Sequence, residues 1–214
     1  MRAPLHTATR AELAAIGLIF ITITIWSWID PHDRLTWWLE ALPALVAAAM
    51  LSATWTRFPL TRLAYWLILI HAIILLVGAH YTYAEVPLFN QLRDAMGADR
   101  NSYDGLGHLA QGFVPAIIGR ELLIRTSPLH AGKWLFILVT LSVLGISAIY
   151  ELIEWAAAIS SGGAADAFLG TQGDPWDTQK DMALALAGAT ISQLMLVKMH
   201  QRQLGASEAV QFNY

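Results

Sequence analysis

Residues 133–156 read KWLFILVTLSVLGISAIYELIEWA, and this stretch decides the fold class. It carries no charged residue between Lys133 and Glu151. Its length lies within the roughly 17–25 residues that a helix needs to cross a bilayer. A run this long and this apolar predicts a membrane-spanning helix.

Five similar stretches lie on either side of it, and together they predict an all-α, polytopic membrane helix bundle with about six transmembrane helices. The first stretch is not followed by a small-residue cleavage pattern, so we expect an uncleaved span. The whole chain, residues 1–214, is expected to form a single integral membrane domain with a loose tail from about residue 203. The expected spans are roughly 12–29, 36–55, 63–84, 104–125, 133–156 and 177–198.

The composition restricts the chemistry that the protein can carry out. Of the 214 residues, 56% are hydrophobic and 14% are charged, and there is no cysteine. Disulfides, thiolate nucleophiles and cysteine-ligated metals are therefore excluded, and a metal would need carboxylate, imidazole or water ligands. The net charge of −3 and the lack of a basic stretch argue against a nucleic-acid partner. The lipid bilayer is the expected partner, and protein partners are not indicated.

The distribution of positive charge predicts the orientation. With a cytoplasmic N-terminus, nine of the 13 Lys and Arg residues fall on the cytoplasmic side and four on the outside. Cytoplasmic loops carry the excess of positive charge, so both termini are predicted to be cytoplasmic.

Three acidic motifs then fall at helix ends on the same, outer face. They are YDGLGH at 103–108, YELIEW at 150–155 and GDPWDTQKD at 173–181. Ionisable groups at the edge of a bilayer are costly and need a partner, a cavity or a function. The three motifs therefore predict one shared polar site.

The spacing of the acidic residues favours a metal site. Pairs at i,i+3 or i,i+4 project from the same face of a helix, and inward-pointing carboxylates and imidazoles build the metal sites of helix bundles. A divalent cation of unknown identity is the expected cofactor. Candidates for general acid or base are Glu151, Glu154 and Asp174. The expected metal ligands are Asp104, His108, Glu151, Glu154, Asp177, Asp181 and His80.

Other readings of these residues remain open. Acidic residues can simply cap helices, although Glu151 and Glu154 lie near a helix C-terminus, where acidic groups are disfavoured. His71 is expected to be a buried, hydrogen-bonded core residue. Interfacial anchoring is expected for Arg120, Glu121 and Arg125, and exposure to solvent for His6, His32, His130 and His200.

Two outer loops flank the proposed site. Residues 85–103 are expected to contain a short amphipathic helix. Residues 157–176 include the sequence SSGG at 160–163, which is suited to a lid or an entry loop.

The three motifs, in this order, resemble those of the YjdF-like family of bacterial inner-membrane proteins. The resemblance extends from the first predicted helix to the sixth. It implies a multi-pass protein of the bacterial inner (plasma) membrane, and it brings no established activity. A weaker similarity is to VanZ-like proteins, which also place an Asp…His pair before acidic residues and an Asp-rich closing helix. The closing helix here lacks the Asn usual in that pattern.

The sequence supports three hypotheses on function, and it leaves open whether the protein is an enzyme. The first is a metal-dependent hydrolysis or transfer on a lipid or envelope precursor at the outer face, with the metal activating water. The second is a small ion- or proton-coupled transporter that uses the same residues. The third is a non-catalytic membrane protein that binds a partner.

Overall fold

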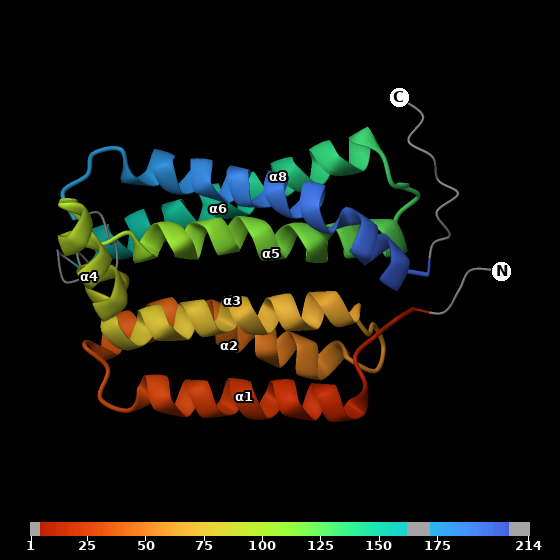
Figure 1. Cartoon of the computed structure of the whole chain (residues 1–214), viewed down its shortest axis with the longest axis horizontal. Coiled ribbons are helices and arrows are strands. Elements are labelled where there is room, and N and C mark those ends of the chain that lie inside the picture. Colours follow the sequence, from red (N-terminus) through yellow and green to blue (C-terminus); the bar gives the residue numbers. More distant parts are fainter. Residues whose placement is uncertain (1–4, 162–171, 206–214) are drawn as a thin grey trace.

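The computed structural model describes residues 5–161 and 172–205, and these residues form long helices joined by short connections (Figure 1). The all-α membrane bundle predicted from the sequence is confirmed. The helices are α1 Arg10–Trp28, α2 Arg34–Thr54, α3 Arg62–Tyr81, the 3-10 turn η1 Tyr83–Glu85, α4 Pro87–Met96, α5 Tyr103–Thr126, α6 Lys133–Ser161 and α8 Asp177–Gln203.

Five of the described helices are long and apolar enough to cross a membrane, namely α1, α2, α3, α6 and α8. The predicted fourth span is α5, which has 24 residues and lies alongside the others in Figure 1. It is less apolar because its residues are covered by α3, α6 and α8 instead of by lipid. Its buried polar residues include Asp104, His108, Arg120 and Glu121.

The bundle consists of two groups of three helices. One contains α1, α2 and α3, and the other contains α5, α6 and α8 (Figure 1). The groups meet where α3 packs against α5, and we call this contact the seam. The short helix α4 lies across one end of the bundle, where α3 ends and α5 and α8 begin. We call this end the site end and the other the terminal end.

Both ends of the described chain meet at the terminal end. The backbone N–H of His6 donates to the carbonyl of Gln203 over 2.8 Å, and the N–H of Arg62 donates to the carbonyl of His6 over 3.0 Å. The start of α1 and the end of α8 therefore lie at the same end of the bundle. That this side is cytoplasmic stays a prediction from the charge distribution.

Polar residues define the starts of the first helices. Thr9 and Glu12 form a capping box at α1, and Thr61 accepts a hydrogen bond from Ala64 at α3. Asp33 caps α2, and the hydrogen bond from the backbone N–H of Thr36 holds the pKa of its carboxyl below the ordinary value. The expected amphipathic helix between 85 and 103 is confirmed as α4, which ends at Gly97 in a left-handed conformation with φ 62°.

The helices α5 and α8 approach each other closely because two glycines face the opposite backbone. A Cβ on Gly112 would lie 2.0 Å from the carbonyl oxygen of Ala185. A Cβ on Gly188 would lie 2.2 Å from the carbonyl oxygen of Leu109. No side chain fits at either position, so these glycines set the spacing of the two helices that carry most of the polar site.

The helix α6 is longer than predicted. It continues to Ser161, not to residue 156, so Glu151 and Glu154 lie inside the helix, more than a turn before its end. The expectation that these residues sit at an unfavourable C-terminus is therefore wrong. Of the predicted lid at 157–176, the first residues are helical, and residues 162–171 lie outside the described part of the chain.

Candidate metal centre

Three of the predicted ligands come together at the site end. Asp104 and His108 lie in the first turns of α5, one turn apart, and Asp181 lies in the second turn of α8. One ligand atom from each of the three residues can be chosen so that all lie within 4.8 Å of one another. Two helices in backbone contact thus bring two carboxylates and one imidazole to a common point.

The distances within this group suit an ion better than direct hydrogen bonds. The His108 Nε2 atom lies 3.4 Å from Asp104 Oδ1 and 4.0 Å from Asp181 Oδ2, and His108 Nδ1 lies 3.7 Å from Glu151 Oε1. Most of these separations exceed the 2.7–3.2 Å of an ordinary N–H···O bond. Ligand atoms around a cation with bonds of about 2.0–2.2 Å stand roughly 3–3.5 Å apart. A small adjustment would convert the group into a coordination shell.

The carboxylates of this group are shielded from water. The exposed fraction is 4% for Asp104, 4% for Asp181, 8% for Glu151 and 7% for Glu154. Buried carboxylates that face one another require a positive charge or protonation, because like charges repel strongly in a poorly solvated environment. The only ionisable base inside the group is His108, which is 4% exposed. A cation would balance the excess negative charge.

Arg100 forms the outer rim of the site. Its guanidinium lies 2.5 Å from Asp177 Oδ1, 3.0 Å from Asp174 Oδ2 and 4.0 Å from Asp104 Oδ2. Asp177 was expected to bind metal, but in this arrangement its carboxylate pairs with Arg100. Asp177 thus lies beside the cluster of Asp104, His108 and Asp181, and its role as a metal ligand stays a prediction.

Asp174 also belongs to the rim. Lys180 and Arg100 both pair with its carboxylate, and the backbone N–H of Trp176 donates to it over 3.0 Å. The Lys180 hydrogen bond, followed by that from Trp176, lowers the pKa of Asp174 below its usual value. An Asp that is held ionised between two cations is suited to positioning Arg100. The prediction that it acts as a general acid or base stays untested.

Asn101 fixes the segment that carries Arg100. Its side-chain nitrogen donates to the carbonyl of Val86 over 3.1 Å and to Asn90 over 2.8 Å, and its oxygen accepts from the N–H of Tyr103. Its backbone N–H and carbonyl both bond the side chain of Gln172, over 2.9 Å each. These contacts join α4, the start of α5 and the segment before α8.

We call the cluster of Asp104, His108 and Asp181, with the buried Glu151 and Glu154, the metal group, after the ligand that it could hold. A cavity of about 210 Å³ extends from this group toward the middle of the bundle, along the seam. Asp104 and His108 form one of its walls. The hydroxyls of Tyr83 and Tyr150 are buried and have no hydrogen-bond partner among the described residues. Gly78 leaves room for the Tyr83 ring, since a Cβ there would lie 1.6 Å from it. The other lining residues are Pro43, His71, Leu75, Gly107, Gln111, Pro115 and Ile146.

Glu40 is the carboxylate that the sequence reasoning overlooked. It lies on α2, one turn before Pro43, and it is 0% exposed. No side chain within residues 5–161 and 172–205 donates a hydrogen bond to its oxygens, and the polar group that faces them is the backbone of Tyr83. A signal was present, because a single ionisable residue inside an apolar span is itself an indication of function. Arg100 was not recognisable by helix spacing, because it lies in the connection before α5, which begins at Tyr103.

Two histidines behave differently from the expectations. His80 is not brought to the metal group by any contact of the described chain: its Nδ1 lies 3.2 Å from the carbonyl of Ser27, and its ring centroid lies 4.4 Å from that of Trp26. His71 was expected to be hydrogen-bonded, but its buried Nε2 has no such partner among the described residues, and the ring lines the cavity.

A second buried charge cluster occupies the terminal end. Glu121 is 0% exposed and accepts hydrogen bonds from the backbone N–H and hydroxyl of Thr61, from Arg125 over 2.6 Å and from His200 over 3.1 Å. Arg120 lies 2.8 Å from the other ring nitrogen of His200. The expectation that His200 is exposed is wrong, since it is 0% exposed, and so is the purely interfacial role expected for Arg120 and Glu121.

Comparison with known proteins agrees with the membrane fold. A family described as "Predicted membrane protein (DUF2238)" matches residues 12–202. The chain is 49% identical over 188 residues to the "Inner membrane protein YjdF" of Escherichia coli (strain K12), covering 88% of this chain and 90% of that protein. No solved structure matches. The similarity to VanZ-like proteins stays a prediction. Since the match extends over nearly the whole bundle, the chain belongs to the DUF2238 family of multi-pass inner-membrane proteins, as its resemblance to YjdF-like proteins implied.

Proposed function

We propose that Asp104, His108 and Asp181 bind one divalent cation at the site end of the bundle. The observation that carries this proposal is the convergence of three buried ligand atoms within 4.8 Å of one another, at distances too long for good hydrogen bonds. Imidazole together with two carboxylates favours Zn²⁺, Mn²⁺ or Fe²⁺ over Ca²⁺. Glu151, 3.7 Å from His108 Nδ1, would orient the ring or join as a further ligand.

The proposed use of this cation is hydrolysis or group transfer on a lipid or envelope precursor. A bound cation lowers the pKa of water and polarises a phosphoryl or acyl oxygen. The protein supplies Glu151 and Glu154 as carboxylates that can accept or return a proton next to the ligands. Arg100 and Lys180, which pair with Asp174 at the rim, are placed to neutralise an anionic part of a substrate.

The binding of a cation is tested on the purified protein. Purified protein should contain one equivalent of a divalent metal by elemental analysis, and chelation should lower its Tm, because a ligand that binds only the folded state stabilises it. His108→Ala and Glu154→Ala should reduce this response, and Arg93→Ala, at an exposed ion pair with Asp94, should keep it. Absence of metal together with an unchanged melting curve would contradict the proposal.

A second experiment tests the catalytic use. Lipids and envelope precursors would be compared by mass spectrometry in cells that lack the protein and in cells complemented with wild type or with His108→Ala. A precursor that accumulates in the deletion and with His108→Ala, and that purified metal-loaded protein converts, would support hydrolysis or transfer. If a variant that no longer binds metal restored the normal lipid composition of the deletion strain, the proposed catalytic use of the metal would be contradicted.

Movement of ions or protons through the protein is the second candidate function. The cavity favours it, because polar residues of α3, α5 and α6 line it from the metal group into the bundle, namely His71, Gln111 and Tyr150. Proteoliposomes that contain a metal-sensitive or a pH-sensitive dye would test it, with Glu40→Gln as the variant. Passage in the wild type that Glu40→Gln abolishes would support transport over hydrolysis. No passage in either would leave the enzymatic or partner-binding reading.

The side of the membrane on which the site acts needs its own test. Reporter fusions at the C-terminus should be cytoplasmic, and fusions after Ala98 should be periplasmic. The reverse result would place the site on the cytoplasmic face.

A further inference from the structure

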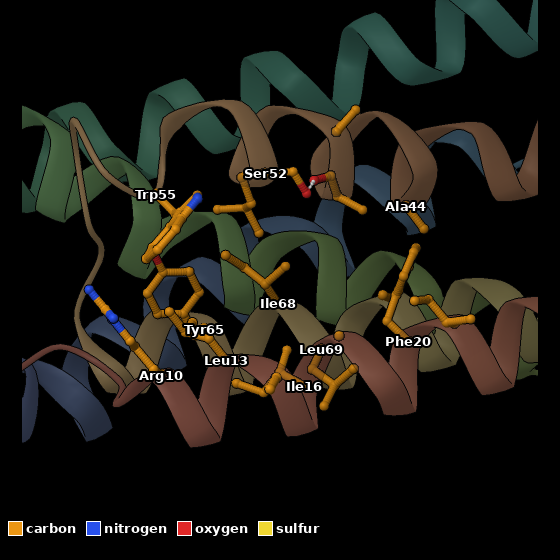
Figure 2. Close-up of a pocket in the computed structure, with 17 residues that line it drawn as sticks. Arg10, Leu13, Ile16, Phe20, Ala44, Ser52, Trp55, Tyr65, Ile68 and Leu69 are labelled. Carbon is orange, nitrogen blue, oxygen red and sulfur yellow. Dashed lines mark hydrogen bonds between the residues drawn. The ribbon is translucent and has the colours of Figure 1, made fainter.

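A long apolar groove lies far from the metal group, between α1, α2 and α3 (Figure 2). Its volume is about 650 Å³. Leu13 and Phe20 of α1 and Ile68 of α3 belong to its walls, with Ala48 of α2 opposite. The groove opens on the half of the molecule that carries none of the three proposed metal ligands, so it needs an explanation of its own.

The groove exists because α1 and α2 are held together at the site end only. There the hydroxyl of Ser27 donates to the carbonyl of Leu76 over 2.6 Å and accepts from Trp37 Nε1 over 2.8 Å. The rings of Trp28, Trp37 and Trp38 pack against one another around this contact. Along the middle of α2 the residues that face α1 are alanines, and α1 packs mainly against α3.

Glycine and alanine keep the groove open. Gly17 of α1 lines it, and a Cβ added at that position would meet no atom within 4 Å. Ala44, Ala48 and Ala49 line it from α2. An apolar groove of this size offers dispersion contacts along its whole length to an apolar chain that enters it.

The length of the groove matches one leaflet. On α1 the lining residues run from Arg10 to Ile21, and on α2 from Ala44 to Trp55. At about 1.5 Å per residue each run covers about 16 Å. This equals about half of the ~30 Å hydrocarbon core of a bilayer.

The two ends of the groove differ in chemistry. Figure 2 shows Arg10, Trp55 and Tyr65 at one end and Phe20 and Ala44 at the other. Arg10 is the only charged residue among those that line the groove, and its side chain is exposed. A cation beside aromatic side chains that prefer the interface marks the level of the lipid head groups. An apolar channel with one positive end is complementary to an amphiphile with one negative end.

We propose that this groove binds an acyl chain of an anionic phospholipid from the leaflet at the terminal end, with its phosphate at Arg10. A helix from a second copy of the chain would fill the apolar part, but it would leave Arg10 without a counter-charge. A lipid would fill the apolar part with its acyl chain and place its phosphate beside Arg10. The site is independent of the metal group and of the function proposed for it.

Native mass spectrometry of the full chain tests the site. The probes are phosphatidylglycerol and phosphatidylcholine with identical acyl chains, offered in equal amounts. The wild type should retain one phosphatidylglycerol, in about fivefold preference, which corresponds to the ~1 kcal/mol of one Arg near an anionic head group. Arg10→Gln should remove the preference, and Arg57→Gln, a cation that does not line the groove, should keep it.

A groove-filling variant tests the acyl-chain part. Gly17→Leu should abolish retention of either lipid. The matched control is Gly145→Leu on α6, because a Cβ at Gly145 also meets no atom within 4 Å and Gly145 lies outside the groove. Circular dichroism and gel filtration would confirm that both variants fold, and Ala48→Leu replaces Gly17→Leu if the latter does not. Unchanged retention in a folded groove-filling variant, or unchanged preference in Arg10→Gln, would overturn the proposal. Dimers that disappear in Gly17→Leu would overturn it in favour of a second copy.

Discussion

Glu40 and Glu121 are both completely buried in the same bundle, and their surroundings are opposite. Glu121 accepts hydrogen bonds from Thr61, Arg125 and His200 and joins α3, α5 and α8 at the terminal end. Glu40 lies on α2 near the site end, where no described side chain donates a hydrogen bond to it and the backbone of Tyr83 is the polar group that faces it. Equal burial thus goes with side-chain partners on both oxygens in one case and with no side-chain partner in the other.

This difference separates structural from functional charge. A buried charge that has all its partners stabilises one arrangement of helices, and removing it leaves the partners uncompensated. A buried carboxyl without partners costs stability, and it is either protonated or paired with something outside the chain, such as an ion, water or a substrate. The cluster at the terminal end is of the first kind, and the metal group with Glu40 is of the second.

Breaking the satisfied cluster should have the largest effect. Glu121→Ala would leave His200 and Arg125 without their carboxylate, and the free energy of unfolding should fall by about 3–5 kcal/mol. Denaturant titration in detergent would measure this loss. A chelator should lower stability in this variant as it does in the wild type. If Glu121→Ala lowered the free energy of unfolding by less than a variant at the site end does, this cluster would not be structural.

Replacing the unsatisfied carboxyl should have the opposite sign. Glu40→Leu removes two buried oxygens without side-chain partners and should raise the free energy of unfolding of the metal-free protein by about 1–3 kcal/mol. The same denaturant titration, with chelator present, measures the change. Glu40→Gln serves as the control, since it keeps the polar atoms and should gain less. A destabilised Glu40→Leu variant would show that Glu40 is a structural group.

A substitution in the metal group should change stability by less, and the sign of the change should depend on whether metal is present. With chelator present, Glu154→Gln removes one of several facing carboxylates and should raise stability by about 1 kcal/mol. With saturating metal, the order should reverse, and wild type should be the more stable protein. Thermal unfolding in the two conditions measures both values. The same ranking in both conditions would mean that no cation is bound next to Glu154.

The smallest effect is expected at the rim. Asp174 has a lowered pKa because of Lys180 and Trp176, so its stabilisation is present above the ordinary pKa of 3.8 and is lost as the pH falls through the lower, folded value. Asp174→Asn should therefore lower Tm slightly at pH 7. It should leave Tm unchanged at a pH below the folded pKa of Asp174, where the carboxyl of the wild type is protonated. High salt should remove the difference at pH 7. A large, salt-independent loss would mean that Asp174 does more than hold Arg100.

Most of the fold was predictable from the apolar runs. In lipid, every backbone N–H and C=O group needs a hydrogen bond within the protein, so a long apolar run must form a helix. The six expected spans all correspond to helices: α6 and α8 begin at the expected residue, and the other four begin one or two residues before it. The end of α6 was placed too early, because Glu151 and Glu154 were taken as the boundary of the apolar segment. Polar side chains inside a helix that face neighbouring helices do not end it.

The site was predictable in part. The spacing of Asp104, His108 and Asp181 within their helices was enough to expect a shared face, because i,i+4 geometry is local. Which distant groups join them depends on packing between helices. His80 faces α1 and His200 faces Glu121, and no local pattern distinguishes these partners from solvent. Glu40 could have been identified by a different argument: a single carboxyl inside an apolar span needs a partner, a cavity or a function.

The contact of Gly112 with Ala185, and of Gly188 with Leu109, also bears on how this molecule can move. Helices that touch backbone to backbone have no flexible side chains between them to absorb a sliding motion, so α5 and α8 should shift together. The seam between α3 and α5 has no such backbone contact at Gly107, where a Cβ would meet nothing within 4 Å, and it contains the cavity. Any opening that admits an ion or a substrate to Asp104 and His108 should therefore separate the two three-helix groups along the seam, with the proposed metal ligands on one group and Glu40 on the other.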